Sequence, residues 1–133
     1  MDEYLREWLL LALSDLKLAK HEIDRPREEV VTIGVCFHSQ QAAEKFLKAY
    51  LVAREVEFEY THELEYLLEL CAREDESFLE LDVGNLTDYA VMVRYPRRTH
   101  IPSIDEAREA LRLAERIKDF VLAKLGIAEE EIA

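Results

Sequence analysis

The chain has 133 residues, half of them apolar, so it is long enough for one compact domain and too short for two. Only 3 Gly and 3 Pro interrupt runs rich in Ala, Leu, Glu, Lys and Arg, which favours helices and argues against a β-sandwich or barrel. The formal net charge of -12 repels nucleic acid and is also an ordinary route to solubility. A phosphate ligand therefore requires a local basic patch. We expect a single all-α domain over residues 1–133.

The first predicted helix covers residues 2 to about 23. Its apolar residues recur at spacings of three and four. They are Leu5, Leu9, Ala12, Leu13, Leu16, Ala19 and Ile23. Pro26 cannot continue this helix, but it suits the first turn of a second helix that we expect from about 28 to 54.

The second predicted helix carries polar residues in two rows. Gln40 and Glu44 interrupt an apolar row, and an adjoining row holds His38, Gln41, Lys45 and Lys48. Polar groups inside an apolar stripe need partners. We expect Gln40 and Glu44 to be exposed at a gap in the bundle or bonded across an interface, either at a dimer seam or with Arg94.

Three further helices are predicted. Thr61 is the expected N-cap of a short third helix, and a fourth is expected between about 78 and 95, with a bend or a junction at Gly84 and Asn85. Pro96 disfavours helical geometry at the residue before it, which ends the fourth helix. These elements, with the last helix below, predict an antiparallel up-and-down bundle of four long helices and one short one.

The last predicted helix starts at the segment "SIDE". Ser103 and Glu106 have the spacing of a capping box, and Gly126 is the expected C-cap. Cys36 and Cys71 are isolated, which indicates reduced thiols in the core of a cytoplasmic protein. The apolar run near the N-terminus is soon broken by polar residues, so we expect neither a signal peptide nor a membrane span.

The segment "VRYPRRTH", residues 93–100, is the densest basic patch. Arg94 can hold a phosphate while His100 exchanges a proton, and such a pair can cleave a phosphodiester without metal. The alternative is that Arg94 pairs with an acidic neighbour, Arg97 and Arg98 are solvated, and His100 is an ordinary loop residue. No cofactor or metal is expected, because the chain has no glycine-rich phosphate loop and its Cys and His residues are scattered.

Three segments together resemble the HEPN domain family, named for a nucleotide-binding domain shared by higher eukaryotes and prokaryotes. They are "FHSQQAAEKFLKAYL" in the second helix, "THEL" at the third and "VRYPRRTH" at the end of the fourth. The resemblance implies an all-α bundle that commonly forms a homodimer. It also implies a metal-independent ribonuclease motif of an Arg, four to six residues and a His, with two such motifs facing one cleft. Arg94 and His100 fit that spacing.

The resemblance further implies a small nucleotidyltransferase as the partner in a toxin–antitoxin pair. Beside the expected catalytic pair, we expect nucleotide or RNA contacts from Tyr95, Arg97, Arg98, His38, Gln41 and Lys45. The pair Tyr95–Pro96 is similar to a compact branch of the family whose members often lack the His. Two other hypotheses therefore stay open: a non-catalytic nucleotide-binding module that docks a nucleotidyltransferase, and a plain helical dimerisation domain.

Overall fold

The computed structural model describes residues 1–92 and 100–132, and within them every regular element is a helix. Three helices are long, namely α1 (Glu3–Ile23), α2 (Thr32–Ala53) and α5 (Ile104–Leu125). Two are short, namely α3 (Leu64–Glu74) and α4 (Leu86–Met92). The predicted all-α bundle is confirmed. Among the described helices, none has both the length and the apolar character needed to cross a bilayer.

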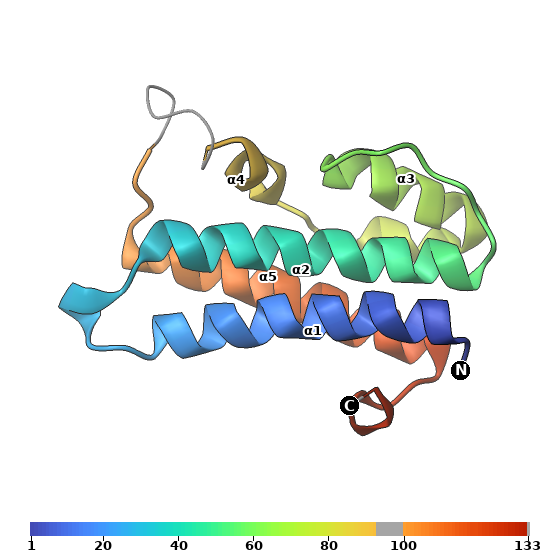
Figure 1. Ribbon diagram of the computed structural model, residues 1–133. Helices are drawn as coiled ribbons and strands as arrows, with labels where there is room; N and C mark the ends of the chain where they lie inside the picture. The colour runs from blue at the N-terminus through green and yellow to red at the C-terminus, as the bar shows by residue number, and fades with distance from the viewer. Residues whose placement is uncertain (93–99, 133) are drawn as a thin grey trace.

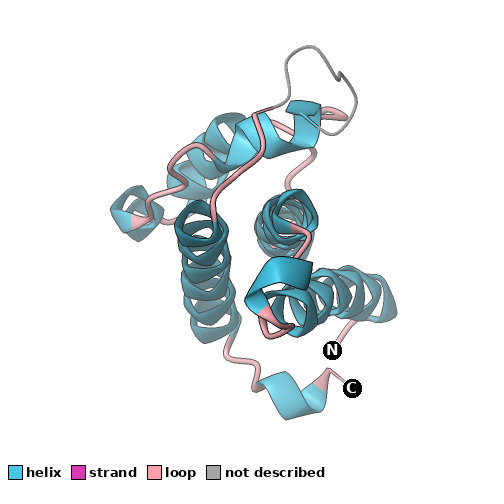
Figure 2. Ribbon diagram, turned by 90° about the vertical axis from the view of Figure 1, so that its left-hand side faces the viewer, coloured by secondary structure: helices cyan, strands magenta, loops and turns pink. Residues whose placement is uncertain are grey.

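Helix α2 is the centre of the bundle. It packs against α1, α5, α3 and α4, and 13 of its 22 residues are buried. Figure 1 shows α1 running antiparallel to α2, α4 running in the direction of α1, and α5 in the direction of α2. Figure 2 shows the same helical bundle turned by 90°, with its left-hand side in Figure 1 facing the viewer. A helix enclosed in this way is apolar around most of its circumference, as the sequence of α2 indicates.

The two cysteines lie in the core, as predicted. Cys36 and Cys71 are both fully buried and form no disulfide. Burial raises the pKa of the Cys36 thiol to about 11 and that of the Cys71 thiol to about 12. Both thiols are therefore protonated at neutral pH, and they act as small apolar residues rather than nucleophiles.

The second helix begins later than the sequence predicts. A 3-10 turn, Arg27–Glu29, follows Pro26, and α2 starts only at Thr32. The intervening chain is extended because a carboxylate from the end of α1 captures it: the Val31 N–H donates to Glu22 Oε2 at 2.9 Å. This backbone hydrogen bond is the largest cause of the lowered pKa of Glu22. The hydrogen bond between the end of α1 and Val31 thus explains why α2 begins only at Thr32.

The third helix is capped differently from the prediction. Its N-cap is Glu63 rather than Thr61, although Thr61 Oγ1 accepts a hydrogen bond from the Glu63 N–H at 3.0 Å. The first helical N–H, that of Leu64, donates to Thr87 Oγ1 on α4 at 3.0 Å. Thr87 therefore satisfies a donor at the helix start that a local cap would otherwise satisfy.

The fourth predicted helix is interrupted, so its first part differs from the prediction. Residues Glu76–Glu80 form a 3-10 turn, and α4 begins at Leu86 after the predicted bend at Gly84. Gly84 has a positive φ of 51°, and its N–H donates to Asp82 Oδ1 at 2.7 Å. The positive φ favours glycine, and an added Cβ at Gly84 would also lie 2.9 Å from a Leu113 methyl group, which would have to shift. The predicted helix end at Tyr95 lies outside the described residues.

Helix α5 has both predicted ends. The Glu106 N–H donates to Ser103 Oγ at 3.0 Å, and the Ser103 N–H donates to Glu106 Oε1 at 3.0 Å. Gly126 ends the helix in the left-handed conformation, with φ of 66°. The capping box and the C-cap are confirmed.

The ends of α2 and α5 yield a stability prediction. Glu55, directly after α2, has a left-handed φ of 58°, the conformation that Gly126 adopts after α5. A non-glycine residue in this conformation costs about 1–2 kcal/mol. Glycine removes that strain but loses more backbone entropy on folding, which cancels part of the gain. We expect Glu55→Gly to raise the free energy of unfolding by about 0.5–1 kcal/mol and Gly126→Ala to lower it by a similar amount, measured by urea denaturation. A destabilised Glu55→Gly variant would contradict this account.

Candidate functional site

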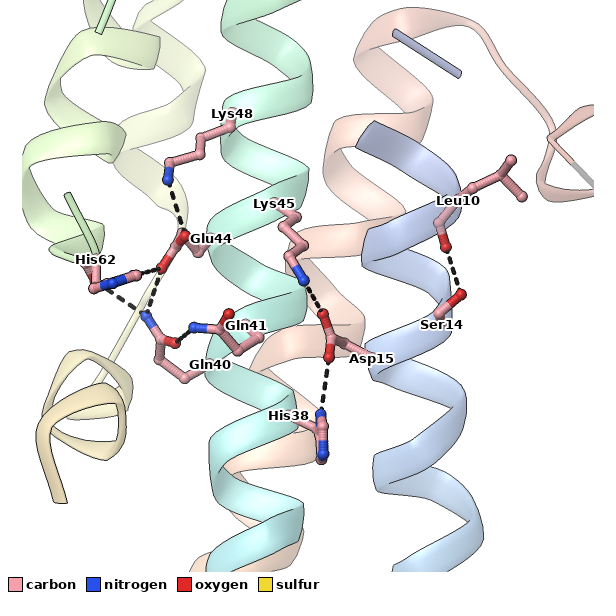
Figure 3. Close-up of polar contacts among 10 residues, drawn as sticks. All are labelled: Leu10, Ser14, Asp15, His38, Gln40, Gln41, Glu44, Lys45, Lys48 and His62. Carbon is pink, nitrogen blue, oxygen red and sulfur yellow. Dashed lines mark hydrogen bonds and ion pairs between the residues drawn. The ribbon is translucent and has the colours of Figure 1, made fainter. Parts of the chain in front are cut away.

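A buried polar cluster lies on the face of α2 that meets the connector between α2 and α3. Gln40, Glu44 and Lys48 are 0%, 3% and 5% exposed. Glu44 Oε1 lies 2.8 Å from His62 Nδ1, and its Oε2 accepts from Lys48 Nζ at 2.9 Å (Figure 3). Gln40 Nε2 donates to the His62 carbonyl at 3.0 Å and lies 3.3 Å from Glu44 Oε1. Among the described residues, the partners of Gln40 and Glu44 are thus His62 and Lys48, and neither residue is exposed at a gap in the bundle. Arg94 lies outside the described residues, so its pairing with Glu44 stays a prediction, as does a dimer seam.

The course of the connector explains why His62 reaches the middle of α2. In Figure 1 the chain turns back at the end of α2 and runs alongside that helix before α3 begins. Aromatic side chains from this connector and from α1 surround the Lys48 ammonium, which lies 5.7 Å from the ring centres of Trp8 and Phe58 and 5.9 Å from that of Tyr60. Aromatic faces and the Glu44 carboxylate together offset the desolvation of this cation.

The buried cluster holds the chain together rather than presenting reactive groups. Each oxygen of Glu44 is engaged, one by Lys48 and the other by His62. His62 Nε2 is buried without a hydrogen-bond partner in the described part of the chain. A buried carboxylate of this kind fixes the position of the connector.

The three predicted binding residues on α2 are engaged by neighbours within the chain. His38 Nδ1 lies 2.8 Å from Asp15 Oδ1 on α1, and Lys45 Nζ donates to Asp15 Oδ2 at 2.5 Å (Figure 3). Gln41 Nε2 donates to Gln40 Oε1 at 2.7 Å. Asp15 was not singled out from the sequence, because it lies on the α2-facing side of α1 as one polar residue among apolar ones. Within the described residues, these side chains contact the α1–α2 junction and not His100.

His100 lies just before α5, and Glu106 holds its imidazole. His100 Nε2 is 3.0 and 3.2 Å from the two carboxylate oxygens of Glu106. The backbone N–H of Ser103 and then His100 lower the pKa of Glu106, so this carboxylate stays ionised. An ionised carboxylate selects the tautomer with the proton on Nε2, which leaves a lone pair on Nδ1. Nδ1 has no hydrogen-bond partner among the described residues, and the side chain is 62% exposed.

Glu106 is the functional candidate that the sequence identified only as a cap. It lies six residues after His100, a spacing that points to no particular contact across a loop and a helix start. Its carboxylate nevertheless accepts from both the Ser103 N–H and the imidazole. The capping box is the signal that could have found it, because the box fixes the carboxylate beside the residues that precede the helix.

A pocket of about 320 Å³ adjoins this histidine at the junction of α4 and α5. Its lining residues are Asn85, Tyr89, Asp105, Glu106 and Glu109. Burial is the largest cause that raises the pKa of Tyr89 to about 12, so its hydroxyl is neutral. Three carboxylates make the pocket unfavourable for a phosphate, which must therefore be held by cationic groups. The predicted ones, Arg94, Arg97 and Arg98, lie outside the described residues, as does Tyr95.

No metal site is formed within the described residues, where no three His, Cys, Asp or Glu side chains group around a common point.

The fold and this site define a small all-α bundle with a charged cluster buried on its second helix and a carboxylate-held histidine before its last. A family model described as the HEPN domain matches residues 5–125, nearly the whole chain. The chain belongs to the HEPN domain family, as the three resembling segments predicted. No curated protein and no solved structure matches it.

The buried cluster yields a second stability prediction. Glu44→Ala leaves the Lys48 ammonium buried without its carboxylate, and removing one partner of a buried pair costs about 3–5 kcal/mol. The matched double variant, Glu44→Leu with Lys48→Met, removes both charges while keeping the volume. We expect it to recover most of the loss in urea denaturation. Equal destabilisation of the single and double variants would contradict the pairing.

Proposed function

We propose that this HEPN-domain protein binds RNA and cleaves it without a metal ion, with Arg94 holding the phosphate and His100 moving the proton. The observation that supports the proposal best is the exposed His100 imidazole, which Glu106 holds at Nε2 and whose Nδ1 has no hydrogen-bond partner among the described residues. A fixed imidazole with one free nitrogen is the arrangement that general acid–base catalysis requires. Membership of the family and the spacing of Arg94 and His100 agree with it.

In the proposed reaction, His100 Nδ1 takes the proton of a ribose 2′-hydroxyl, and the 2′-oxygen attacks the adjacent phosphorus. The bond from phosphorus to the 5′-oxygen breaks, and that oxygen takes up the proton from the His100 imidazolium, which returns to the neutral imidazole. The products are a 2′,3′-cyclic phosphate and a 5′-hydroxyl. Glu106 stabilises the imidazolium while it carries the proton, and the Arg94 guanidinium stabilises the charge that grows on the phosphoryl oxygens.

The remaining predicted residues have supporting roles in this proposal. Arg97 and Arg98 attract the RNA backbone and Tyr95 stacks on a base. His38, Gln41 and Lys45 contact RNA only if they exchange their bonds to Asp15 and Gln40 for the ligand. We therefore place them at the edge of the site.

We further propose the setting in which this site works. Residues 1–133 form a single domain in the cytoplasm, and two copies form a homodimer whose Arg94 and His100 motifs face one cleft. A small nucleotidyltransferase is the partner in a toxin–antitoxin pair. These proposals rest on membership of the HEPN domain family, whose model matches residues 5–125.

The catalytic proposal predicts cleavage of single-stranded RNA at neutral pH in EDTA. We expect His100→Ala to lower the rate by about 10²–10⁴, because a general acid–base group contributes that much. Free imidazole should restore part of the activity, since the His100 side chain is exposed. Full cleavage by His100→Ala would overturn the proposal. Tight binding of mononucleotides in titration calorimetry, without RNA turnover, would favour the non-catalytic module instead.

The role of Glu106 is tested by a pair of variants that separates holding the imidazole from capping the helix. Glu106→Gln keeps a capping residue at the same position but removes the charge, so we expect an unchanged melting temperature and a kcat lower by about tenfold, the value of one charged hydrogen bond. Ser103→Ala removes the cap but keeps the carboxylate, so we expect a lower melting temperature and a nearly unchanged kcat. The reverse pattern would show that Glu106 serves only the helix.

A further inference from the structure

A groove of about 530 Å³ lies where the start of α1 meets the end of α2 and the connector that follows it. Three acidic residues line the groove together with four apolar or aromatic ones. Figure 1 shows the start of α1 and the end of α2 at one end of the bundle, and the start of α5, which follows His100, at the other. The groove is therefore remote from the site proposed for RNA, and its role does not depend on RNA cleavage.

Part of the groove is an apolar and aromatic surface. Val52, from the end of α2, and Val56, from the connector, line it and are half-buried. Tyr4 and Phe58 line it too, and the Trp8 ring lies edge-on to both, at 6.2 Å between ring centres in each case. Tyr4 nevertheless remains 56% exposed. An aliphatic stem or a planar group can therefore rest against this surface.

The charged part of the groove is entirely acidic, because Asp2, Glu55 and Glu57 line it and no Lys or Arg does. Asp2 caps α1, and its Oδ1 accepts from the Tyr4 N–H at 2.7 Å. The side chains of Glu55 and Glu57 are exposed, and they have no hydrogen-bond or ion-pair partner among the described residues. The groove therefore attracts a cation that also carries apolar surface.

Glu55 keeps a side chain at a position where glycine would be less strained. Its φ is 58°, whereas the corresponding residue after α5 is Gly126, with φ of 66°. Strained residues of this kind persist where the surrounding structure holds them, and they gather at binding sites. The end of α5 shows that this fold accepts glycine after a helix, so the strain at Glu55 points to a role for its carboxylate beyond folding.

We infer that the groove docks a basic segment of a partner protein, which inserts an arginine side chain beside Tyr4, Glu55 and Glu57. The methylene groups of the arginine cover the apolar lining. Its planar guanidinium stacks on the exposed Tyr4 ring and donates to the carboxylates as a fork. The Lys48 ammonium does not oppose this cation, because it is paired with Glu44 at 2.9 Å. The same carboxylates repel RNA, whose backbone is anionic.

Intrinsic fluorescence tests the docking of arginine, because Trp8 is the single tryptophan of the chain and contacts both lining aromatics. We expect the peptide acetyl-ALRLA-amide to change this fluorescence. It should bind about tenfold more tightly than the same peptide with citrulline, the neutral isostere of arginine. Added salt should weaken binding of the arginine peptide only. Equal binding of the two peptides, or no binding of the arginine peptide at millimolar concentration, would overturn the inference.

Three variants separate the groove from the net charge of the chain. Glu57→Gln and Glu55→Gly each remove one carboxylate from it, and each should raise the dissociation constant of the arginine peptide about tenfold, the value of one charged hydrogen bond. Because Glu55→Gly is expected to stabilise the fold, unfolding cannot explain its weaker binding. Glu115→Gln removes the same charge near the other end of α1, where Glu115 pairs with Lys20 at 3.3 Å, and should leave binding unchanged. Equal weakening by Glu115→Gln, or unchanged binding in both groove variants, would overturn the inference.

Discussion

The buried carboxylate of Glu44 is the contact on which the arrangement of the second half of the bundle depends. It binds Lys48 within α2 and His62 in the connector, and so holds the returning chain against the central helix. The connector leads into α3, and the Leu64 N–H at the start of α3 donates to Thr87 on α4. One buried carboxylate, 18 positions before His62, thus helps to fix the connector and, through it, the contact between α3 and α4.

At the start of α5, one carboxylate likewise makes two contacts. The Glu106 carboxylate closes the capping box with Ser103 and also holds the His100 imidazole. Because the box is local, the histidine is positioned by its own helix rather than by distant packing. Its surroundings are acidic, with Asp105 and Glu109 in the adjoining pocket. In a chain of net charge -12, binding of a phosphate here requires the arginines of residues 94–98, which is why the proposal joins the histidine to that segment.

The sequence predicts what local chemistry controls. The periodicity of α1, the ends of α5 and the glycine bend at Gly84 follow from rules that act within a few residues. What it does not predict depends on neighbours distant along the chain. The start of α2 is displaced by a carboxylate from α1, and Thr87 on α4 completes the start of α3. The same holds for the polar residues of α2. The sequence predicts their rows, but Asp15 and His62, which bind His38 and Glu44, come from other elements and cannot be found from a spacing along the chain.

The central claim is that His100 presents Nδ1 to RNA while Glu106 holds Nε2, and the imidazole nitrogens can be observed directly. Long-range ¹H–¹⁵N NMR distinguishes the two tautomers of each of the four histidines. We predict that neutral His100 is protonated at Nε2, and that a non-cleavable 2′-deoxy-substituted RNA shifts its Nδ1 signal while those of half-buried His62 stay in place. A His100 protonated at Nδ1, or one whose signals are unmoved at saturating RNA, would contradict the account.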